Sequence, residues 1–105
     1  MAGTFETEAD RVLEMLTAAF EEAFPDADVE LSGGVLTIEL EDRRTWVINR
    51  HGPMRQIWVS SPRAGAWHFA PDGKGSWIDT RQGHDLFKLL VEDVRELAGA
   101  ELKLA

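Results

Sequence analysis

Six short segments in which apolar and polar residues alternate lie between two segments with helical periodicity, and this order leaves few folds open. Apolar residues at steps of three and four predict one helix over residues 5–24 and another over residues 85–98. Alternation with a period of two, interrupted by short turns, is typical of antiparallel strands with one buried face. We expect strands around residues 28–32, 36–41, 45–49, 56–60, 67–69 and 76–78.

The order of these elements predicts an α+β fold of the two-layer sandwich type. Two terminal helices should pack on one face of a five- to six-stranded antiparallel sheet, because each element has one apolar side to bury. The other face of the sheet should lie in water. A chain of 105 residues suits one core, so we expect a single domain over residues 1–105.

The absence of cysteine excludes several kinds of chemistry. Disulfides, thiolate zinc sites, cysteine-ligated clusters and a cysteine nucleophile all need this residue, and the chain has none. No apolar stretch approaches the roughly 20 residues of a membrane span. The N-terminal residues lack the basic and apolar regions of a signal peptide. We therefore expect a soluble, cytoplasmic protein.

Charge is divided unevenly along the chain. The first 42 residues contain twelve carboxylates and a single base, Arg11, whereas the remaining residues carry a small net positive charge. The whole chain has a formal net charge of −8, which argues against nucleic acid or an anionic membrane as the main partner. A surface of this kind is suited to meet cations.

Several of these acids stand where a helix does not favour them. Glu21 and Glu22 lie near the C-terminal end of the first predicted helix, where each misplaced charge costs about 0.3–1 kcal/mol. Asp10 and Glu14 form a like-charge pair four residues apart. Such repulsion is easier to understand if a ligand or partner relieves it, although a merely acidic, solvated surface is the alternative.

The negative charge continues from the helix onto the first predicted strand through Asp26, Asp28 and Glu30. Carboxylate oxygens suit hard cations such as iron, manganese, calcium and magnesium. An exposed row of carboxylates without a cage should bind several ions weakly. The same row could equally bind a basic patch on another protein.

Trp58 departs from the expected burial pattern. The alternation that buries its neighbours places Trp58 on the open face of the sheet, together with Asn49 and Gln56. An exposed Trp on a polar face is a typical anchor for a protein partner. On this reading, Trp58→Ala should change stability by less than about 0.5 kcal/mol. The alternative is that the loop at residues 51–53 covers the ring.

The remaining polar residues give weaker signals. Arg50 and Arg55 are expected near the same surface as Trp58, as a small positive patch. His51, His68 and His84 have no metal-ligand spacing, and His68 should point outward from its strand. We find no catalytic constellation in the sequence.

Three segments closely resemble the frataxin family, called CyaY in bacteria: residues 32–38, 46–53 and 55–65. The most distinctive run is Asn-[Lys/Arg]-x-x-Pro-x-x-Gln-[Ile/Val]-Trp, which here extends from Asn49 to Trp58. The likeness continues through Trp67-His68-Phe69, Ser76-Trp77 and the second helix, so that it covers about residues 5–99.

The resemblance implies an α-β sandwich that binds ferrous and ferric iron weakly, without an organic cofactor, and acts in iron–sulfur cluster assembly. Frataxins bind the cysteine desulfurase and the cluster scaffold protein, and they are proposed to supply iron or to regulate sulfur transfer. Carried over by position, the iron-binding acids are Glu14, Glu21, Glu22, Asp26, Asp28, Glu30 and Glu41. The partner-binding residues are Glu21, Glu22, Asn49, Arg50, Gln56 and Trp58.

Two alternatives to an iron-supplying role stay open at this point. The chain could be a metal-independent module that docks on a basic patch of the desulfurase through Glu21 and Glu22. Ferroxidase activity ranks third, because the sequence lacks the Glu-x-x-His pair of di-iron bundles; we do not expect a conventional enzyme. We expect a monomer in the bacterial cytoplasm, with an iron-driven oligomer as the alternative.

The sequence departs from the family pattern at two places. His51 stands where the family usually has Gln, which alters the loop or adds an imidazole. Residues 17–19 interrupt the row of acids late in the first helix.

Overall fold

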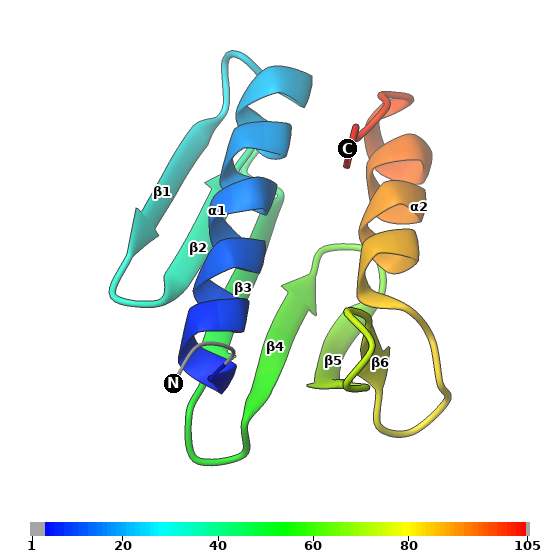
Figure 1. Cartoon of the computed structure of the whole chain (residues 1–105). Coiled ribbons are helices and arrows are strands. Elements are labelled where there is room, and N and C mark those ends of the chain that lie inside the picture. The colour runs from blue at the N-terminus through cyan, green and yellow to red at the C-terminus, as the bar shows by residue number, and fades with distance from the viewer. Residues whose placement is uncertain (1–3, 105) are drawn as a thin grey trace.

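The computed structural model describes residues 4–104 and contains two helices and one antiparallel sheet (Figure 1). The elements follow in the order α1 (Phe5–Ala23), β1 (Asp28–Ser32), β2 (Val35–Glu39), β3 (Thr45–His51), β4 (Gln56–Ser61), β5 (Gly65–Pro71), β6 (Trp77–Asp79) and α2 (Leu86–Ala98). The six strands lie in sequence order, and each pairs antiparallel with the next. The predicted fold class is confirmed, with six strands rather than five.

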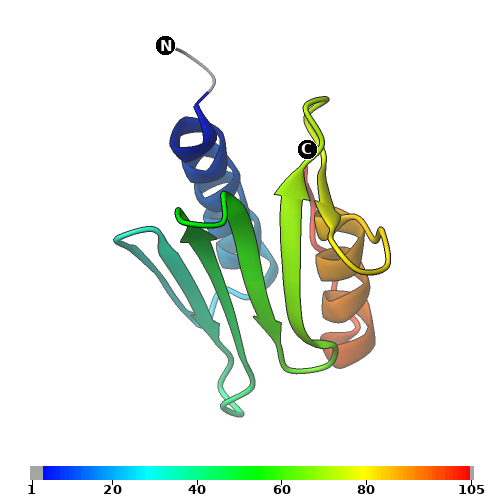
Figure 2. The same ribbon diagram turned by 90° about the horizontal axis from the view of Figure 1, so that it is seen from below.

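The sheet has one face covered by helices and one open face. Figure 2 shows both helices on the same side of the sheet. On β3, Trp46 and Ile48 are completely buried beneath the helices, whereas Val47 and Asn49 alternate with them and point to the other side. The period-two pattern of the sequence therefore reports the two faces directly.

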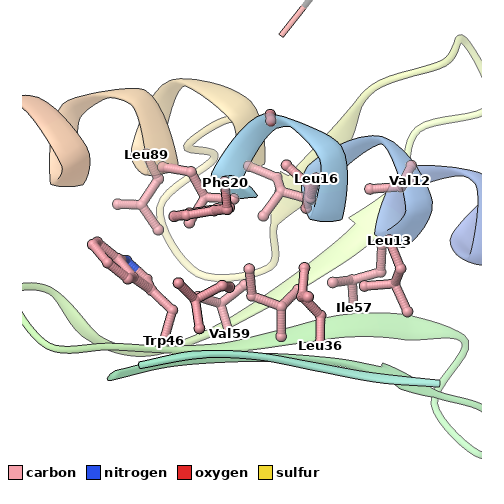
Figure 3. Packing of buried hydrophobic residues seen from close by; sticks show 14 of the residues in the cluster. Val12, Leu13, Leu16, Phe20, Leu36, Trp46, Ile57, Val59 and Leu89 are labelled. Carbon is pink, nitrogen blue, oxygen red and sulfur yellow. The ribbon is translucent and has the colours of Figure 1, made fainter. Parts of the chain in front are cut away.

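The core lies between the helices and the covered face, as Figure 3 shows for part of it. Phe20 of α1 packs against Trp46 of β3, with ring centroids 5.2 Å apart. Leu102, in the segment after α2, is also buried, so this segment packs against the core.

The helix ends are set by local signals in the sequence. The Thr4 side chain accepts a hydrogen bond from a backbone amide of the first turn, as an N-cap does. Helix α1 ends at Ala23 and Phe24 is its C-cap, one residue earlier than predicted, because the residue before a proline disfavours helical geometry. Asp85 is the N-cap of α2 rather than its first residue, and Gly99 ends the helix with a φ of 61°.

A buried carboxylate ties α2 to the sheet. Asp93 is fully buried, and its Oδ2 accepts hydrogen bonds from Trp46 Nε1 at 3.1 Å and from Ser61 Oγ at 2.6 Å. Its Oδ1 accepts a hydrogen bond from Arg63 Nε at 2.8 Å. Arg63 also reaches Glu92 on the surface of α2. The carboxylate thus joins α2, β3 and the β4–β5 turn through one side chain.

Candidate functional site

The seven carboxylates carried over from the family resemblance form a ridge around the β1 edge of the molecule. All seven are exposed, and we call them the acidic ridge: Glu14, Glu21, Glu22, Asp26, Asp28, Glu30 and Glu41. The ridge begins on α1, passes through the α1–β1 loop and continues on β1 and the β2–β3 turn. Asp28 and Glu30 alternate with the half-buried Val29 and lie on the open face. The helical part of the ridge lies in the other layer.

No basic side chain of the described residues neutralises the ridge. Within residues 4–104, none of the seven carboxylates forms an ion pair. Two arginines that share surface hollows with ridge acids are paired with other carboxylates: Arg43 with Glu39 at 3.5 Å and Arg44 with Asp42 at 2.7 Å. Asp10, one member of the predicted like-charge pair, is neutralised by Arg50, but the repulsion predicted among the ridge acids is not relieved by an ion pair within residues 4–104.

The structure brings only part of the ridge together. Asp26, Asp28 and Glu41 line one surface hollow together with Glu39 and Arg43. In the part of the chain from residue 4 to 104, no three His, Asp or Glu side chains converge closely enough to form a metal cage. The ridge can attract cations, but it does not enclose one.

Glu39 is a further acid of this surface that sequence reasoning missed. It lies directly opposite Asp28 in the β1–β2 register, and like charges in such a pair destabilise each other. Its only ion-pair partner among residues 4–104 is Arg43, whose side chain is 88% exposed, so the neutralisation is weak. The signal that could have found it is the hairpin register around the Gly33-Gly34 turn.

The open face carries a stack of three rings. The Trp58 indole lies between two imidazoles, 3.7 Å from the His51 ring and 4.0 Å from the His68 ring between centroids. The planes are nearly parallel, at 6° and 10°. The Trp58 Nε1 donates a hydrogen bond to Gln56 Oε1 at 2.8 Å.

This stack corrects the expectation that Trp58 is exposed. The ring is half-buried, because both of its faces are covered by histidines. The alternative holds in part: His51, the first residue of the loop expected to cover the ring, covers one face, whereas His68 of β5 covers the other. His68 does point outward on the open face, as predicted, but it lies against the indole rather than standing free.

The prediction of a positive patch beside Trp58 is also wrong. Arg50 lies on the helix-covered side, where Nη1 pairs with Asp10 Oδ1 of α1. Its guanidinium passes over Gly34, and a Cβ at that glycine would lie 3.1 Å from it. Arg55 places its guanidinium carbon 5.9 Å from the centre of the Phe5 ring, near the start of α1. Both arginines therefore leave the surface that was predicted for them.

The open face carries no acidic side chain, lysine or arginine along β3, β4 and β5. Asn49 lies directly opposite Trp58, and Gln56 directly opposite His51. The outward-facing side chains on β3, β4 and β5 include no carboxylate, lysine or arginine: Thr45, Val47, Asn49, His51, Gln56, Trp58, Ser60, Ala66, His68 and Ala70. The molecule thus offers an acidic edge and, beside it, a polar but uncharged surface.

Comparisons with known proteins agree on one family. The model of the frataxin-like domain matches residues 2–100. The iron–sulfur cluster assembly protein CyaY of Cupriavidus necator is 40% identical over 97 residues, which are 92% of this chain and 86% of that protein. Among residues 4–104, no helix has both the length and the apolar character to cross a membrane.

Solved structures show the same fold. Frataxin from Psychromonas ingrahamii superposes with a TM-score of 0.84 at 26% identity, over 96% of this chain and 94% of that one. Trimeric yeast frataxin from Saccharomyces cerevisiae, complexed with ferrous iron, gives a TM-score of 0.75 at 39% identity, over 88% and 86% of the two chains. The predicted resemblance is confirmed, and the chain belongs to the frataxin family.

Proposed function

We propose that this protein binds iron weakly on the acidic ridge and acts in iron–sulfur cluster assembly, where it supplies iron to the desulfurase–scaffold complex or regulates that complex. The observation that carries the proposal is the row of exposed carboxylates without an ion pair among residues 4–104. Relatives support it by name: CyaY of Cupriavidus necator is an iron–sulfur cluster assembly protein, and the yeast frataxin structure is a complex with ferrous iron.

The geometry favours weak and exchangeable iron binding. Carboxylate oxygens are ligands that iron accepts. A hollow lined by Asp26, Asp28, Glu39 and Glu41 offers several of them, but no cage converges there in the described residues. An ion held in this way keeps most of its water and can leave readily. That behaviour suits a protein that hands iron on rather than storing it.

The two candidate partner surfaces face different directions. Glu21 and Glu22 lie on α1, in the helix layer, whereas Asn49, Gln56 and Trp58 lie on the open face of the sheet. We propose that the acidic surface meets a basic patch of the cysteine desulfurase and that the uncharged face meets the scaffold protein. Because the surfaces do not overlap, both partners could bind at once.

A metal-independent docking role is the second candidate, and one observation favours it. The ridge lacks a converged set of ligands within residues 4–104, yet its charges are well placed to steer a basic partner. In this reading iron is incidental. Ferroxidase activity ranks below both, since oxidation at paired irons requires ligands that face each other.

Charge reversal on α1 separates the two readings. We expect Glu21→Lys/Glu22→Lys to abolish desulfurase binding measured by calorimetry. A matched control is Glu6→Lys/Glu8→Lys, which makes the same change of charge at exposed sites in the first turn of the same helix. If binding by the unmodified chain persists with a chelator present and only the first pair removes it, docking is independent of metal. If both double variants bind like the unmodified chain, the ridge is not a docking surface.

A further inference from the structure

The stack on the open face includes a histidine that also holds a turn. His51 is the last residue of β3, and its Nδ1 accepts a hydrogen bond from the backbone N–H of Met54 at 3.2 Å. Met54 lies in the β3–β4 turn and is one of two large apolar side chains exposed among residues 4–104, at 57%. One imidazole therefore touches both Trp58 and the turn that displays Met54.

This hydrogen bond fixes the protonation state of the ring in the observed geometry. An imidazole nitrogen that accepts a hydrogen bond cannot carry a proton, so the neutral ring has its hydrogen on Nε2. A proton added to Nδ1 would point at the Met54 N–H, donor against donor. The charged ring can keep its contact with the Trp58 indole, since a cation over an indole face is favourable. The turn, rather than the stack, then has to move.

Among residues 4–104, the neighbours of the His51 ring include no compensating carboxylate. On β4 the ring faces Gln56 and Trp58, and His68 of β5 lies on the far side of the indole. On β2 the residue beside Asn49 is the apolar Val35. The one charged residue of the turn is Arg55, whose guanidinium lies toward α1.

His68, at the other end of the stack, has different neighbours from His51. His68 shares a surface hollow with Asp79 and Arg81. The Asp79 carboxylate is buried and accepts hydrogen bonds from the amides of Arg81 and Gln82, so its hydrogen bonds lie within its own loop. His68 accordingly serves as an internal comparison for His51, since it stacks on the same indole without holding a turn.

We propose that His51 is a protonation-sensitive latch for the β3–β4 turn, and that its protonation releases Met54 from a fixed position beside the uncharged face. The effect on partner binding rests on the proposed function. A docking surface that is ordered before binding loses less entropy on association. Releasing the turn, and adding a positive charge to an uncharged face, therefore weakens docking of the scaffold protein.

The latch itself is tested without any partner. In NMR spectra of the full chain between about pH 7 and pH 5, the range in which histidine ordinarily titrates, the Met54 amide should shift with the same midpoint as the His51 ring. In His51→Gln this amide transition should disappear, whereas His68→Gln should retain it. A Met54 amide that ignores the His51 titration, or that moves equally in His51→Gln, overturns the proposal.

The docking consequence is tested with the purified scaffold protein of a bacterial relative. The affinity of the unmodified chain should fall roughly two- to tenfold more between about pH 7 and pH 5 than that of His51→Gln, the factor that one hydrogen bond usually represents. Equal falls would overturn the link to docking. If no binding occurs near pH 7, the proposed sheet-face function fails, and the latch is then judged by the Met54 amide alone.

Discussion

Replacing the buried carboxylate of Asp93 by an amide should destabilise the protein far more than the same change at its exposed neighbour. Asp93→Asn conserves the shape of the side chain. Its single oxygen can replace Oδ2, which accepts from Trp46 and Ser61, but its NH₂ group must then face Arg63 Nε. The variant loses a charge-assisted hydrogen bond and leaves two donors in contact.

The expected magnitude follows from these contacts. Breaking a buried charge pair by removing one partner usually costs about 3–5 kcal/mol. Here the cost should be lower, about 2–4 kcal/mol, because the Arg63 side chain is 31% exposed and retains Glu92. Glu92→Gln is the matched control: Glu92 accepts from the same arginine at the same 2.8 Å, but its side chain is 62% exposed. We expect a loss below about 1 kcal/mol for it.

Urea unfolding followed by circular dichroism gives both free energies. The midpoint should fall clearly for Asp93→Asn and hardly for Glu92→Gln, with an unchanged slope in both. Equal losses in the two variants would refute the reasoning, because burial would then make no difference to the ion pair. A loss below about 0.5 kcal/mol for Asp93→Asn would show that the network does not stabilise the fold.

Three further predictions follow from the burial and hydrogen bonding of single side chains. Trp58→Ala should cost about 1–2 kcal/mol of unfolding free energy, because it removes two ring contacts; a change near zero in urea unfolding would show that the stack is not stabilising. Trp77→Ala should cost about 3–5 kcal/mol of unfolding free energy, because the residue is only 3% exposed. A loss under about 1 kcal/mol, the size expected for an exposed site, would contradict the place of Trp77 in the core. Hydrogen bonds from the backbone amides of Lys74 and Ser76 lower the pKa of Asp72 in the folded protein. The ionised carboxylate therefore stabilises the fold above the ordinary pKa of aspartate, and this stabilisation is lost as the pH falls through the lowered pKa of the folded state. NMR titration of the Asp72 carboxyl carbon should give a midpoint below that of the unfolded chain, and an equal or higher midpoint would contradict this.

The helices, the strands and their approximate ends could be predicted from the sequence because the signals that set them are local. Thr4 and Gly99 act at their own positions in the chain, and the alternation along β3 reports burial one strand at a time. The number of exposed acids was likewise visible, since composition and helical spacing do not depend on tertiary contacts.

Side-chain contacts between strands could not be predicted from the sequence in the same way. The ring stack depends on Trp58 lying opposite residue 68 and diagonal to residue 51, which requires the register of three strands. Arg50 was assigned to the wrong face by its closeness in sequence to Asn49. The period of two that buries Trp46 and Ile48 also places Arg50 under α1, beside Asp10. Applying that period to every residue of β3 would have corrected the assignment.

Titration with ferrous iron under anaerobic conditions tests most directly whether the unneutralised ridge binds the metal. Paramagnetic iron broadens the amide resonances of nearby residues. We predict that broadening appears first at residues 14–30 and 39–41, and that Asp26→Asn/Asp28→Asn reduces it around the hollow that these acids line. Broadening spread evenly over the surface, or unchanged in this variant, would contradict the proposal that the acidic ridge is the iron-binding surface.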